Sequence, residues 1–275
     1  MNTGLLKILV CPICKTGPLR YEKSSQAESL TCPECKKIYR IESGIPNMLP
    51  DGISSSLLKD GSWKSWSKRL DNFILWRKRT WNGSSEADEL QTSAFALKER
   101  FVEFTALKNS SKKIIDIGCG DGGIRAMLGE CDYYGIDPLL IEKHRYVFPI
   151  VKGIGEYLPF GDGVFDEVIL SQVLDHCNSI DELITEIIRV TGKNGSVNVM
   201  QYISKPEGSW RRIYYELLRF YLSVKGSNTT ETKMRHFDVE GLLRFFRNRF
   251  EEVRFLKYSD SQIFIKASLW KKVQR

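Results

Sequence analysis

The stretch IIDIGCGDGG, residues 114–123, decides the fold of this chain. The segment 112–118, KKIIDIG, predicts a strand, and Gly118, Gly120 and Gly123 at and after its end have the order G-x-G-x-x-G. Glycines at a strand-to-helix turn let the backbone approach a ligand closely, and the N-terminus of the helix favours negative charge. The stretch therefore predicts a site for NAD, FAD or S-adenosylmethionine.

Two carboxylates beside this loop indicate which of the three ligands the site suits. Asp116 stands two residues before the first glycine, where a carboxylate can accept hydrogen bonds from the ammonium group of S-adenosylmethionine. A pyrophosphate would be repelled at the same place. Asp137 ends the next predicted strand, in YYGIDP, where its carboxylate can bind both hydroxyls of a ribose. The two residues together favour S-adenosylmethionine.

From residue 112 onward, short apolar runs alternate with helical segments, as a parallel α/β sheet requires. Two more strands at the C-terminal end are separated by a short polar turn, which predicts an antiparallel pair. A further helix before the sheet is expected at about 88–107, and Asp238 can cap another. The expected strands are 112–118, 132–138, 165–171, 196–203, 250–258 and 262–270, and the expected helices between them are 120–130 and 180–190.

Four motifs in this order resemble the class I S-adenosylmethionine-dependent methyltransferases. They are IIDIGCGDGG, YYGIDP, the run from Gly153 to His176 and RVTGKNGSV at 189–197. The branch they resemble most includes the quinone-biosynthesis enzymes and many small-molecule methyltransferases, and the similarity covers roughly residues 90–270. It implies a Rossmann-like, mostly parallel seven-stranded sheet with an antiparallel last strand.

The resemblance also implies a set of cofactor-binding residues at the carboxyl ends of the strands. In chain order, the first three hold the methionine end and the fourth holds the ribose. The next two lie against the adenine, and the last two face the sulfonium. The set is Asp116, Gly118, Gly120, Asp137, Gly155, Glu156, Ser171 and Gln172. Ile154 stands where the family often has an acidic residue for the adenine amino group, so that hydrogen bond is in doubt.

The sequence does not identify a catalytic residue. Methyl transfer from a sulfonium requires mainly that the acceptor be aligned and water be excluded, and a base is needed only if the acceptor must lose a proton. His176 is the candidate for such a base, with Asp175 and His236 behind it, although histidines at these places often only orient a loop. The run 171–174, SQVL, replaces the Asn-Pro-Pro-Tyr-type motif, which argues against the exocyclic amines of adenine or cytosine.

A cysteine module precedes this domain. Its four cysteines are spaced C-x₂-C-x₁₇-C-x₂-C, which is within the range of a structural zinc site, with a redox pair as the alternative. The ligands are Cys11, Cys14, Cys32 and Cys35. The module resembles the small zinc-ribbon activator subunits that pair with methyltransferases of tRNA, rRNA and release factors. A ribbon fused to the same catalytic fold also occurs in bacterial rRNA guanine methyltransferases.

These motifs divide the 275 residues into a zinc ribbon at 1–50, a linker with a Trp-rich helix at 51–89 and a methyltransferase domain at 90–275. A basic amphipathic helix near 209–224 is expected to cap the acceptor pocket, with binding to an anionic membrane surface as the alternative. No signal peptide and no apolar run of about 20 residues is recognised, so no transmembrane segment is expected. We expect a cytoplasmic protein.

The net charge of +7 is unevenly distributed. Residues 111–205 hold 9 basic and 14 acidic side chains, whereas residues 206–275 hold 15 and 8. The basic end would attract an anionic partner such as RNA, a nucleotide-linked sugar or an anionic lipid. Three functions remain: a methyltransferase for a small, sugar-like, amphipathic or lipid-linked acceptor, an rRNA or tRNA base methyltransferase and, last, a non-catalytic regulatory module.

Overall fold

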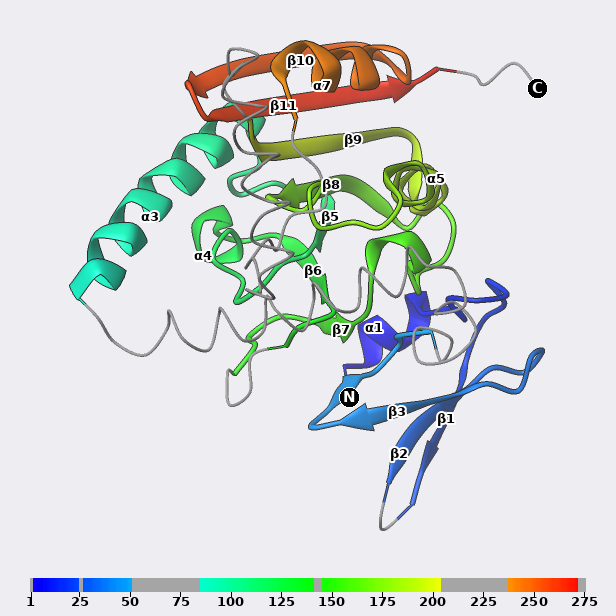
Figure 1. Cartoon of the computed structure of the whole chain (residues 1–275). Coiled ribbons are helices and arrows are strands. Elements are labelled where there is room, and N and C mark those ends of the chain that lie inside the picture. The colour runs from blue at the N-terminus through cyan, green and yellow to red at the C-terminus, as the bar shows by residue number, and fades with distance from the viewer. Residues whose placement is uncertain (1, 25–26, 51–84, 141–144, 204–236, 272–275) are drawn as a thin grey trace, which may run out of the picture.

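The computed structural model describes residues 2–24, 27–50, 85–140, 145–203 and 237–271 (Figure 1). Three features expected from the sequence lie outside these residues: the Trp-rich helix, the cap helix near 209–224 and His236. Among the described helices, none is long and apolar enough to cross a membrane.

The N-terminal ribbon consists of one short helix and a four-stranded antiparallel sheet in the order β1-β2-β3-β4. The side chains of Leu30 in β2 and Tyr39 in β3, which pair across the two strands, are buried in this sheet, whereas all residues of β1 are exposed. The elements of the ribbon are α1 (Thr3–Ile8), β1 (Arg20–Lys23), β2 (Glu28–Thr31), β3 (Ile38–Glu42) and β4 (Ile45–Pro46).

The second part, called the catalytic part because it corresponds to the expected methyltransferase domain, is built on a seven-stranded sheet in the order β10-β11-β9-β8-β5-β6-β7. Its helical segments are α3 (Ser85–Thr105), α4 (Arg125–Leu128), η3 (Gly155–Tyr157), α5 (Ile180–Val190) and α7 (Val239–Arg247). Its strands are β5 (Lys113–Ile117), β6 (Asp132–Asp137), β7 (Ile150–Lys152), β8 (Phe165–Ser171), β9 (Thr191–Tyr202), β10 (Phe250–Ser259) and β11 (Gln262–Trp270).

The directions of the strands confirm the fold expected from the sequence. Strands β7, β6, β5, β8 and β9 are parallel, whereas β11 is antiparallel to both β9 and β10. The chain leaves β5 toward β6 on one side, and β8 lies on the other side. Ligands of such sheets bind where the strand order reverses, outside the carboxyl ends of the strands. The fold thus places a crevice beyond the ends of β5 and β8.

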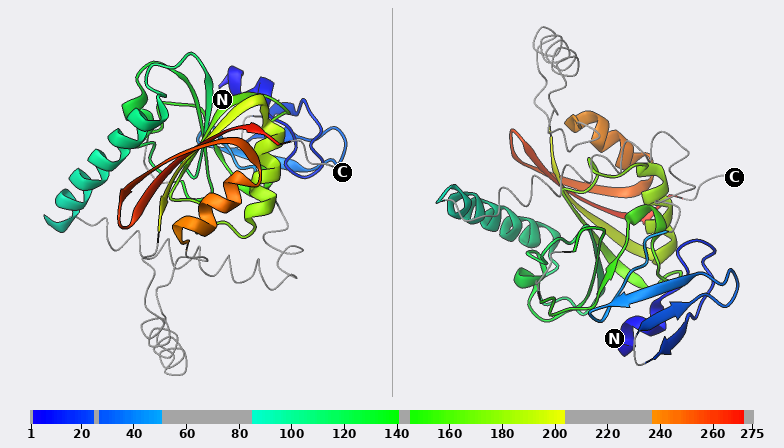
Figure 2. Two further views of the ribbon diagram at one scale, coloured as in Figure 1. Left: turned by 90° about the horizontal axis from the view of Figure 1, so that it is seen from above. Right: turned by 60° about the horizontal axis from the view of Figure 1, so that its bottom comes forward.

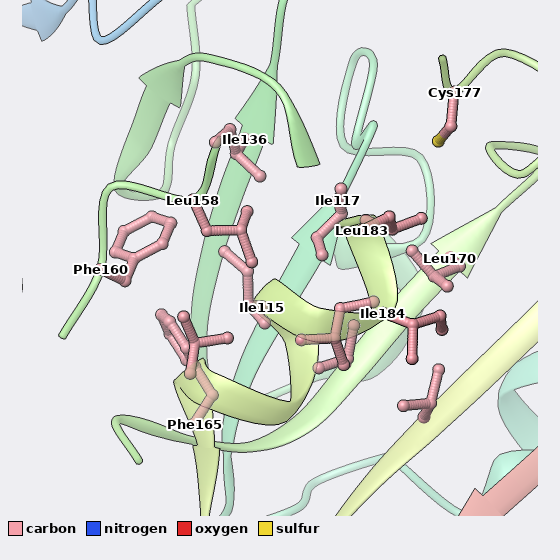
Figure 3. Close-up of a cluster of buried hydrophobic side chains, with 14 of the residues drawn as sticks. Ile115, Ile117, Ile136, Leu158, Phe160, Phe165, Leu170, Cys177, Leu183 and Ile184 are labelled. Atoms are coloured by element: carbon pink, nitrogen blue, oxygen red, sulfur yellow. The ribbon is translucent and has the colours of Figure 1, made fainter. Parts of the chain in front are cut away.

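Helices cover both faces of this sheet. On one face α5 directs Leu183 and Ile184 onto Ile115, Ile117 and Leu170 of β5 and β8 (Figure 3). A second buried cluster, on the opposite face, joins residues of α3 and α4 to β5, β8, β9 and β11. The apolar character of β5 and β8 on both faces is what a strand between two layers of helices requires.

Local signals fix the start of two helices. Ser179 accepts a hydrogen bond from the amide of Glu182 at 3.2 Å, which caps α5. Asp238 accepts from the amide of Gly241 at 2.7 Å, which caps α7 as the sequence predicted. Each cap satisfies an amide that has no partner within its own helix.

Two elements of the catalytic part, a helix and a strand, differ in length from the predicted ranges. The helix predicted over 120–130 is only α4, Arg125–Leu128, because left-handed glycines at 120 and 122 keep the backbone out of the helical region. Strand β9 begins at Thr191 rather than Ser196, so the predicted Asn194-Gly195 turn lies within an irregular strand start, where the pairing with β8 shifts register.

The ribbon joins the catalytic part through backbone pairing at two places. Asn47 forms a parallel bridge with Lys152 of β7, and the amide of Met48 donates to the Lys152 carbonyl at 2.8 Å. Leu9 forms an antiparallel bridge with Phe160. The right view of Figure 2 shows the ribbon lying against the catalytic part.

The two parts also share one hydrophobic core. Leu9, Leu30 and Met48 of the ribbon belong to the same buried cluster as Val151 and Phe160 of the catalytic part. We call this contact, formed by residues 5–10 and 45–48 with 150–152 and 158–161, the seam. The ribbon is therefore packed into the catalytic part rather than held only by a linker.

Ion pairs reinforce the seam from α5. Lys15 of the ribbon lies 2.5 Å from the Glu186 carboxylate, and Arg189 contacts the same carboxylate at 2.8 Å. Arg189 also donates to the carbonyls of Leu158 at 2.9 Å and Phe160 at 2.6 Å. The partly buried Arg189 thus fixes the segment against which the ribbon pairs.

We predict that Phe160→Ala lowers the free energy of unfolding by about 3–5 kcal/mol, because it opens a cavity in the core common to both parts. Chemical denaturation monitored by hydrogen exchange should show β2 and β8 losing protection in one transition. Phe95→Ala is the matched control, since Phe95 is 55% exposed on α3 and should cost no more than about 0.5 kcal/mol. A ribbon that keeps its protection after β8 has unfolded would contradict a common core.

Candidate functional site

The four predicted cysteine ligands lie together in the ribbon. Their sulfur atoms are all within 4.8 Å of one another. Two of the separations are 3.6 Å, between Cys11 and Cys35, and 3.5 Å, between Cys14 and Cys32. Four thiolates bound to zinc at about 2.3 Å in a tetrahedron are about 3.8 Å apart. The donor set and its spacing fit a structural zinc ion.

The two cysteine pairs are built alike. In each, the amide of a lysine donates to the carbonyl of the first cysteine: Lys15 to Cys11 at 2.9 Å and Lys36 to Cys32 at 3.2 Å. Both lysines have a φ of 61°, in the left-handed region. This tight turn directs two sulfur atoms to the same point, and the repeat of the turn supplies the other two.

Neighbouring groups favour a thiolate at Cys14 and can donate to one at Cys11, whereas burial raises the pKa of the Cys35 thiol to about 12. Hydrogen bonds from Thr16 lower the pKa of the Cys14 thiol to about 6. The hydroxyl of Tyr39 lies 3.0 Å from the Cys11 sulfur and is buried with it, so it can donate to a thiolate there. Such outer contacts orient metal ligands.

The glycine loop follows β5 at the crevice. Gly118, Gly120 and Gly122 have φ values of 73°, 58° and 81°, a region that side chains other than glycine rarely adopt. A Cβ atom at Gly118 would lie 2.5 Å from a methyl carbon of Val173, which follows β8. The loop therefore brings bare backbone close to the end of β8, as a ligand cradle requires.

Asp116 is buried beneath this loop. Its Oδ2 accepts a hydrogen bond of 2.6 Å from the hydroxyl of Tyr133, and the residue is 1% exposed. Its Oδ1 is buried and has no hydrogen-bond partner within the described residues. Burial raises the pKa of the carboxyl to about 7, although the bond from Tyr133 lowers it. A buried oxygen of this kind is costly unless a ligand donates to it.

Asp137 connects the end of β6 to the glycine loop. Its two carboxylate oxygens accept from the amide of Gly120 at 2.9 Å and from the amide of Leu139 at 2.7 Å. The residue is only 7% exposed. Because a carboxylate can accept up to about four hydrogen bonds, these two bonds are compatible with additional bonds from ribose hydroxyls.

Glu156 and Gly155 have structural contacts that the sequence did not indicate. One oxygen of Glu156 accepts from the amides of Asn178 at 2.7 Å and Ser179 at 3.4 Å, so the carboxylate fixes the turn before α5. Burial raises its pKa. A Cβ atom at Gly155 would collide with Leu183 of α5. The side chain of Glu156 is therefore engaged with α5.

Gln172 holds three strand ends together. Its amide donates to the Met200 carbonyl at 2.7 Å, and its side chain joins the Tyr202 amide at 2.7 Å and Gln262 at 2.8 Å. Its φ is 59°, an uncommon conformation for a residue with a side chain. Ser171 precedes it, half-buried at the end of β8. Strained backbone of this kind is frequent beside functional sites.

The candidate base His176 lies in the turn after β8. Its amide donates to the Val173 carbonyl at 2.9 Å, and the residue is half-buried. Asp175 is 1% exposed and accepts from the side chain of Gln201 at 3.0 Å. The turn therefore places both residues beyond the end of β8, on the side of the sheet edge where the glycine loop lies.

Sequence reasoning missed Tyr133 and Lys98. Tyr133 follows Asp132 at the start of β6 and reaches Asp116 only because β5 and β6 are neighbours. Lys98 lies on α3, and a Cβ atom at Gly123 would collide with its Nζ. A lysine in an ordinary helix, far from the loop in the sequence, gives no signal of this contact.

Two family models match the chain. Residues 115–199 match a methyltransferase domain, and residues 3–44 match the Trm112p-like proteins. Among curated relatives, a UPF0434 protein of Methylobacillus flagellatus is 55% identical over 51 residues, which are 18% of this chain and 80% of that protein. A UPF0434 protein of Burkholderia lata is 53% identical over 51 residues, 18% of this chain and 75% of that protein.

Solved structures with a similar fold are more distant. A methyltransferase of Thermotoga maritima, described as a possible histamine N-methyltransferase, is 19% identical with a TM-score of 0.43, covering 65% of this chain and 94% of that one. The geranyl diphosphate C-methyltransferase of Streptomyces coelicolor is 12% identical with a TM-score of 0.45, covering 63% and 75%. At these values the likenesses carry no argument about the acceptor.

We predict that Cys32→Ser abolishes zinc binding and lowers the soluble yield, because the ribbon lacks a sufficient core without its metal. Zinc content by mass spectrometry and folding by circular dichroism measure the two effects. Cys131→Ser is the control, since Cys131 is partly exposed and lies outside the four-cysteine cluster. A well-folded, zinc-free variant that has lost only its activity would show that the metal has a chemical role instead.

Proposed function

Because the chain belongs to the Trm112p-like family of UPF0434 proteins through its first residues and continues into a methyltransferase domain, we propose the following reaction. The protein transfers the methyl group of S-adenosylmethionine to a small, sugar-like or amphipathic acceptor. Methyl donation by S-adenosylmethionine follows from the methyltransferase domain. The acceptor class and the roles of individual residues are the proposal.

One observation carries the cofactor assignment: the buried Oδ1 of Asp116, which has no hydrogen-bond partner in the described part of the chain, beside a loop of left-handed glycines. An ammonium group of a ligand would supply the missing donor and compensate the buried charge. A phosphate at the same place would leave the oxygen without a donor and add repulsion. The chemistry of this position therefore fits the methionine end of S-adenosylmethionine.

The proposed binding roles follow the ends of the strands. Asp116 and the amides around Gly118 and Gly120 hold the methionine end, and Asp137 holds the ribose. The backbone at 154–156 lies against the adenine, with Glu156 fixing that segment to α5. Ser171 and Gln172 at the end of β8 face the sulfonium. In this arrangement, the protein aligns the donor and acceptor and excludes water, and the bound cofactor supplies the electrophilic methyl group.

His176 is proposed as the proton acceptor only for an acceptor that must lose a proton. Its place in the turn after β8, next to the buried Asp175, would put its imidazole beside the reacting groups. A neutral imidazole can take a proton near pH 7. An already nucleophilic acceptor would need no such group.

The zinc site has a structural role in this proposal. Cys11, Cys14, Cys32 and Cys35 would hold one ion and so fix the ribbon. Lys15, which follows the second of these cysteines, pairs with Glu186 of α5. The metal would thereby stabilise the seam rather than take part in methyl transfer.

The charge distribution favours a small acceptor over RNA. Residues 111–205, which include the glycine loop and the ends of β5, β6 and β8, carry five more acidic than basic side chains (9 basic, 14 acidic). Buried or nearly buried carboxylates at Asp116, Asp137, Glu156 and Asp175 belong to this region. The net negative charge of this region opposes the phosphate backbone of RNA.

The second candidate function is methylation of an rRNA or tRNA base. Two observations favour it: the match of residues 3–44 to the Trm112p-like proteins and the basic residues 206–275. The basic segment 209–224, for which the sequence predicts a cap helix, belongs to this region, and either RNA or an anionic membrane surface would suit it. A non-catalytic regulatory role ranks last, because the glycine loop and both aspartates are intact.

The affinity for the cofactor should depend on the protonation of Asp116. Its pKa is raised to about 7, and only the carboxylate form binds an ammonium group well. Below pH 7 the proton must leave before the ligand binds, so the dissociation constant of S-adenosylhomocysteine should rise about tenfold between pH 8 and pH 6. Isothermal titration calorimetry measures this change.

5′-Methylthioadenosine is the control ligand for this experiment, because it keeps the adenosine and the thioether but lacks the amino acid group. Its affinity should change little over the same pH range, and Asp116→Asn should remove the pH dependence for S-adenosylhomocysteine. In the ligand-free protein, the same raised pKa makes stability fall as pH rises from about 4 to 7, since the carboxyl ionises from about pH 4 in the unfolded chain but keeps its proton in the folded protein until about pH 7. An equal pH dependence for the two ligands would argue against Asp116 as the ammonium site.

The acceptor class is tested with S-adenosylmethionine carrying a labelled methyl group. We expect label to be transferred to a component of a metabolite and lipid extract and not to total RNA, with Asp137→Ala reducing incorporation. Mass spectrometry of the labelled product then identifies the methylated atom. Label found in RNA would overturn the small-acceptor proposal and support the second candidate.

A further inference from the structure

The ammonium group of Lys98 lies against the glycine loop. Lys98 belongs to α3, and its Nζ occupies the space that a Cβ atom at Gly123 would need. Within the described part of the chain, this ammonium has no hydrogen bond within 3.5 Å and no carboxylate within 4.0 Å. Lysine side chains are long and rotatable, so a charge fixed beside a backbone loop without a partner requires an explanation.

The opposite charge beneath the same loop is Asp116. Lys98 acts electrostatically on this carboxyl and lowers its pKa, against the larger effect of burial. The two groups are nevertheless not in contact, and the buried Oδ1 of Asp116 has no donor among the described residues. Counting only the described residues, the loop thus has a cation without a partner at its surface and an incompletely paired anion beneath it.

The carboxylate of Asp121, which belongs to the loop itself, does not pair with Lys98. Asp121 is part of the loop, and its Oδ1 accepts from the amide of Gly123 at 3.0 Å. The carboxylate of Asp121 therefore closes the turn of the loop. No ion pair within 4.0 Å joins it to Lys98.

We propose that Lys98 binds the carboxylate of the methionine end of S-adenosylmethionine, while Asp116 binds the ammonium of the same end. The assignment rests on the proposed function and deepens it, because it explains how the site recognises a zwitterion rather than a nucleoside alone. An α-amino acid group carries both charges on neighbouring atoms, and the loop presents one complementary charge on each side. Methyl transfer itself does not involve Lys98, which is a positioning residue.

Decarboxylated S-adenosylmethionine provides a direct test, because it keeps the sulfonium and the ammonium and lacks only the carboxylate. We expect the wild-type protein to bind S-adenosylmethionine at least about tenfold more tightly than the decarboxylated form, the effect of one charge-assisted hydrogen bond. Lys98→Met should lower the affinity for S-adenosylmethionine by about the same factor and leave the affinity for the decarboxylated ligand unchanged. Lys98→Arg, which keeps the charge, should restore part of the affinity. Calorimetry on the full chain measures each of these dissociation constants.

Two control variants separate the proposal from a general loss of structure. Lys108→Met removes an exposed lysine beyond the end of α3 and should change neither affinity. Asp116→Asn should lower the affinity for both ligands, because both carry the ammonium group. If Lys98→Met weakened both ligands equally, or neither, the carboxylate assignment would be wrong while the methyltransferase proposal stood. If the wild-type protein bound neither ligand, the proposed function itself would fail.

Discussion

The hydrogen bond from the amide of Gly120 to the carboxylate of Asp137 is the contact on which the crevice depends. It ties the loop after β5 to the end of β6, and the left-handed glycines between them can then follow a path closed to other residues. Because β8 lies on the other side of β5, the same loop also faces Val173. The cradle, the buried Asp116 and the end of β8 are thus held in one place by a single turn of backbone.

Much of the fold could be predicted because its signals are local. The helix 180–190 and the strands 165–171 and 262–270 agree with the structure to the residue, since apolar periodicity and the Ser179 cap are visible in the sequence. Strand β7 was not predicted: it has three residues, and besides the preceding strand β6 it pairs with Asn47, about a hundred residues earlier in the chain. The helix after the glycine loop was predicted too long, because the sequence pattern does not show which glycines adopt positive φ.

In the candidate site, too, residues marked by a local pattern could be chosen from the sequence, whereas contacts made by tertiary packing could not. Asp116, Asp137 and the four cysteines were chosen from spacing, and the structure gives each a surrounding that suits a ligand. The sequence could not show that the Glu156 side chain binds the backbone just before α5, or that the Gln172 side chain binds the backbone of β9 and the side chain of Gln262 in β11. Lys98 and Tyr133 approach the loop only through tertiary packing. Contacts between distant segments are what a pattern of neighbouring residues leaves out.

The parallel bridge between Asn47 and Lys152 also bears on how the protein is made. Strand β7 ends the seven-stranded sheet, and an uncovered edge of this kind readily pairs with other chains. The ribbon is synthesised before the catalytic part, and segments nearer the N-terminus generally fold first. Residues 45–48 would then already be outside the ribosome when β7 emerges, and they would pair with that edge before a neighbouring nascent chain could. Because the ribbon and the catalytic part belong to one chain, every copy of the sheet is synthesised together with the segment that covers its edge.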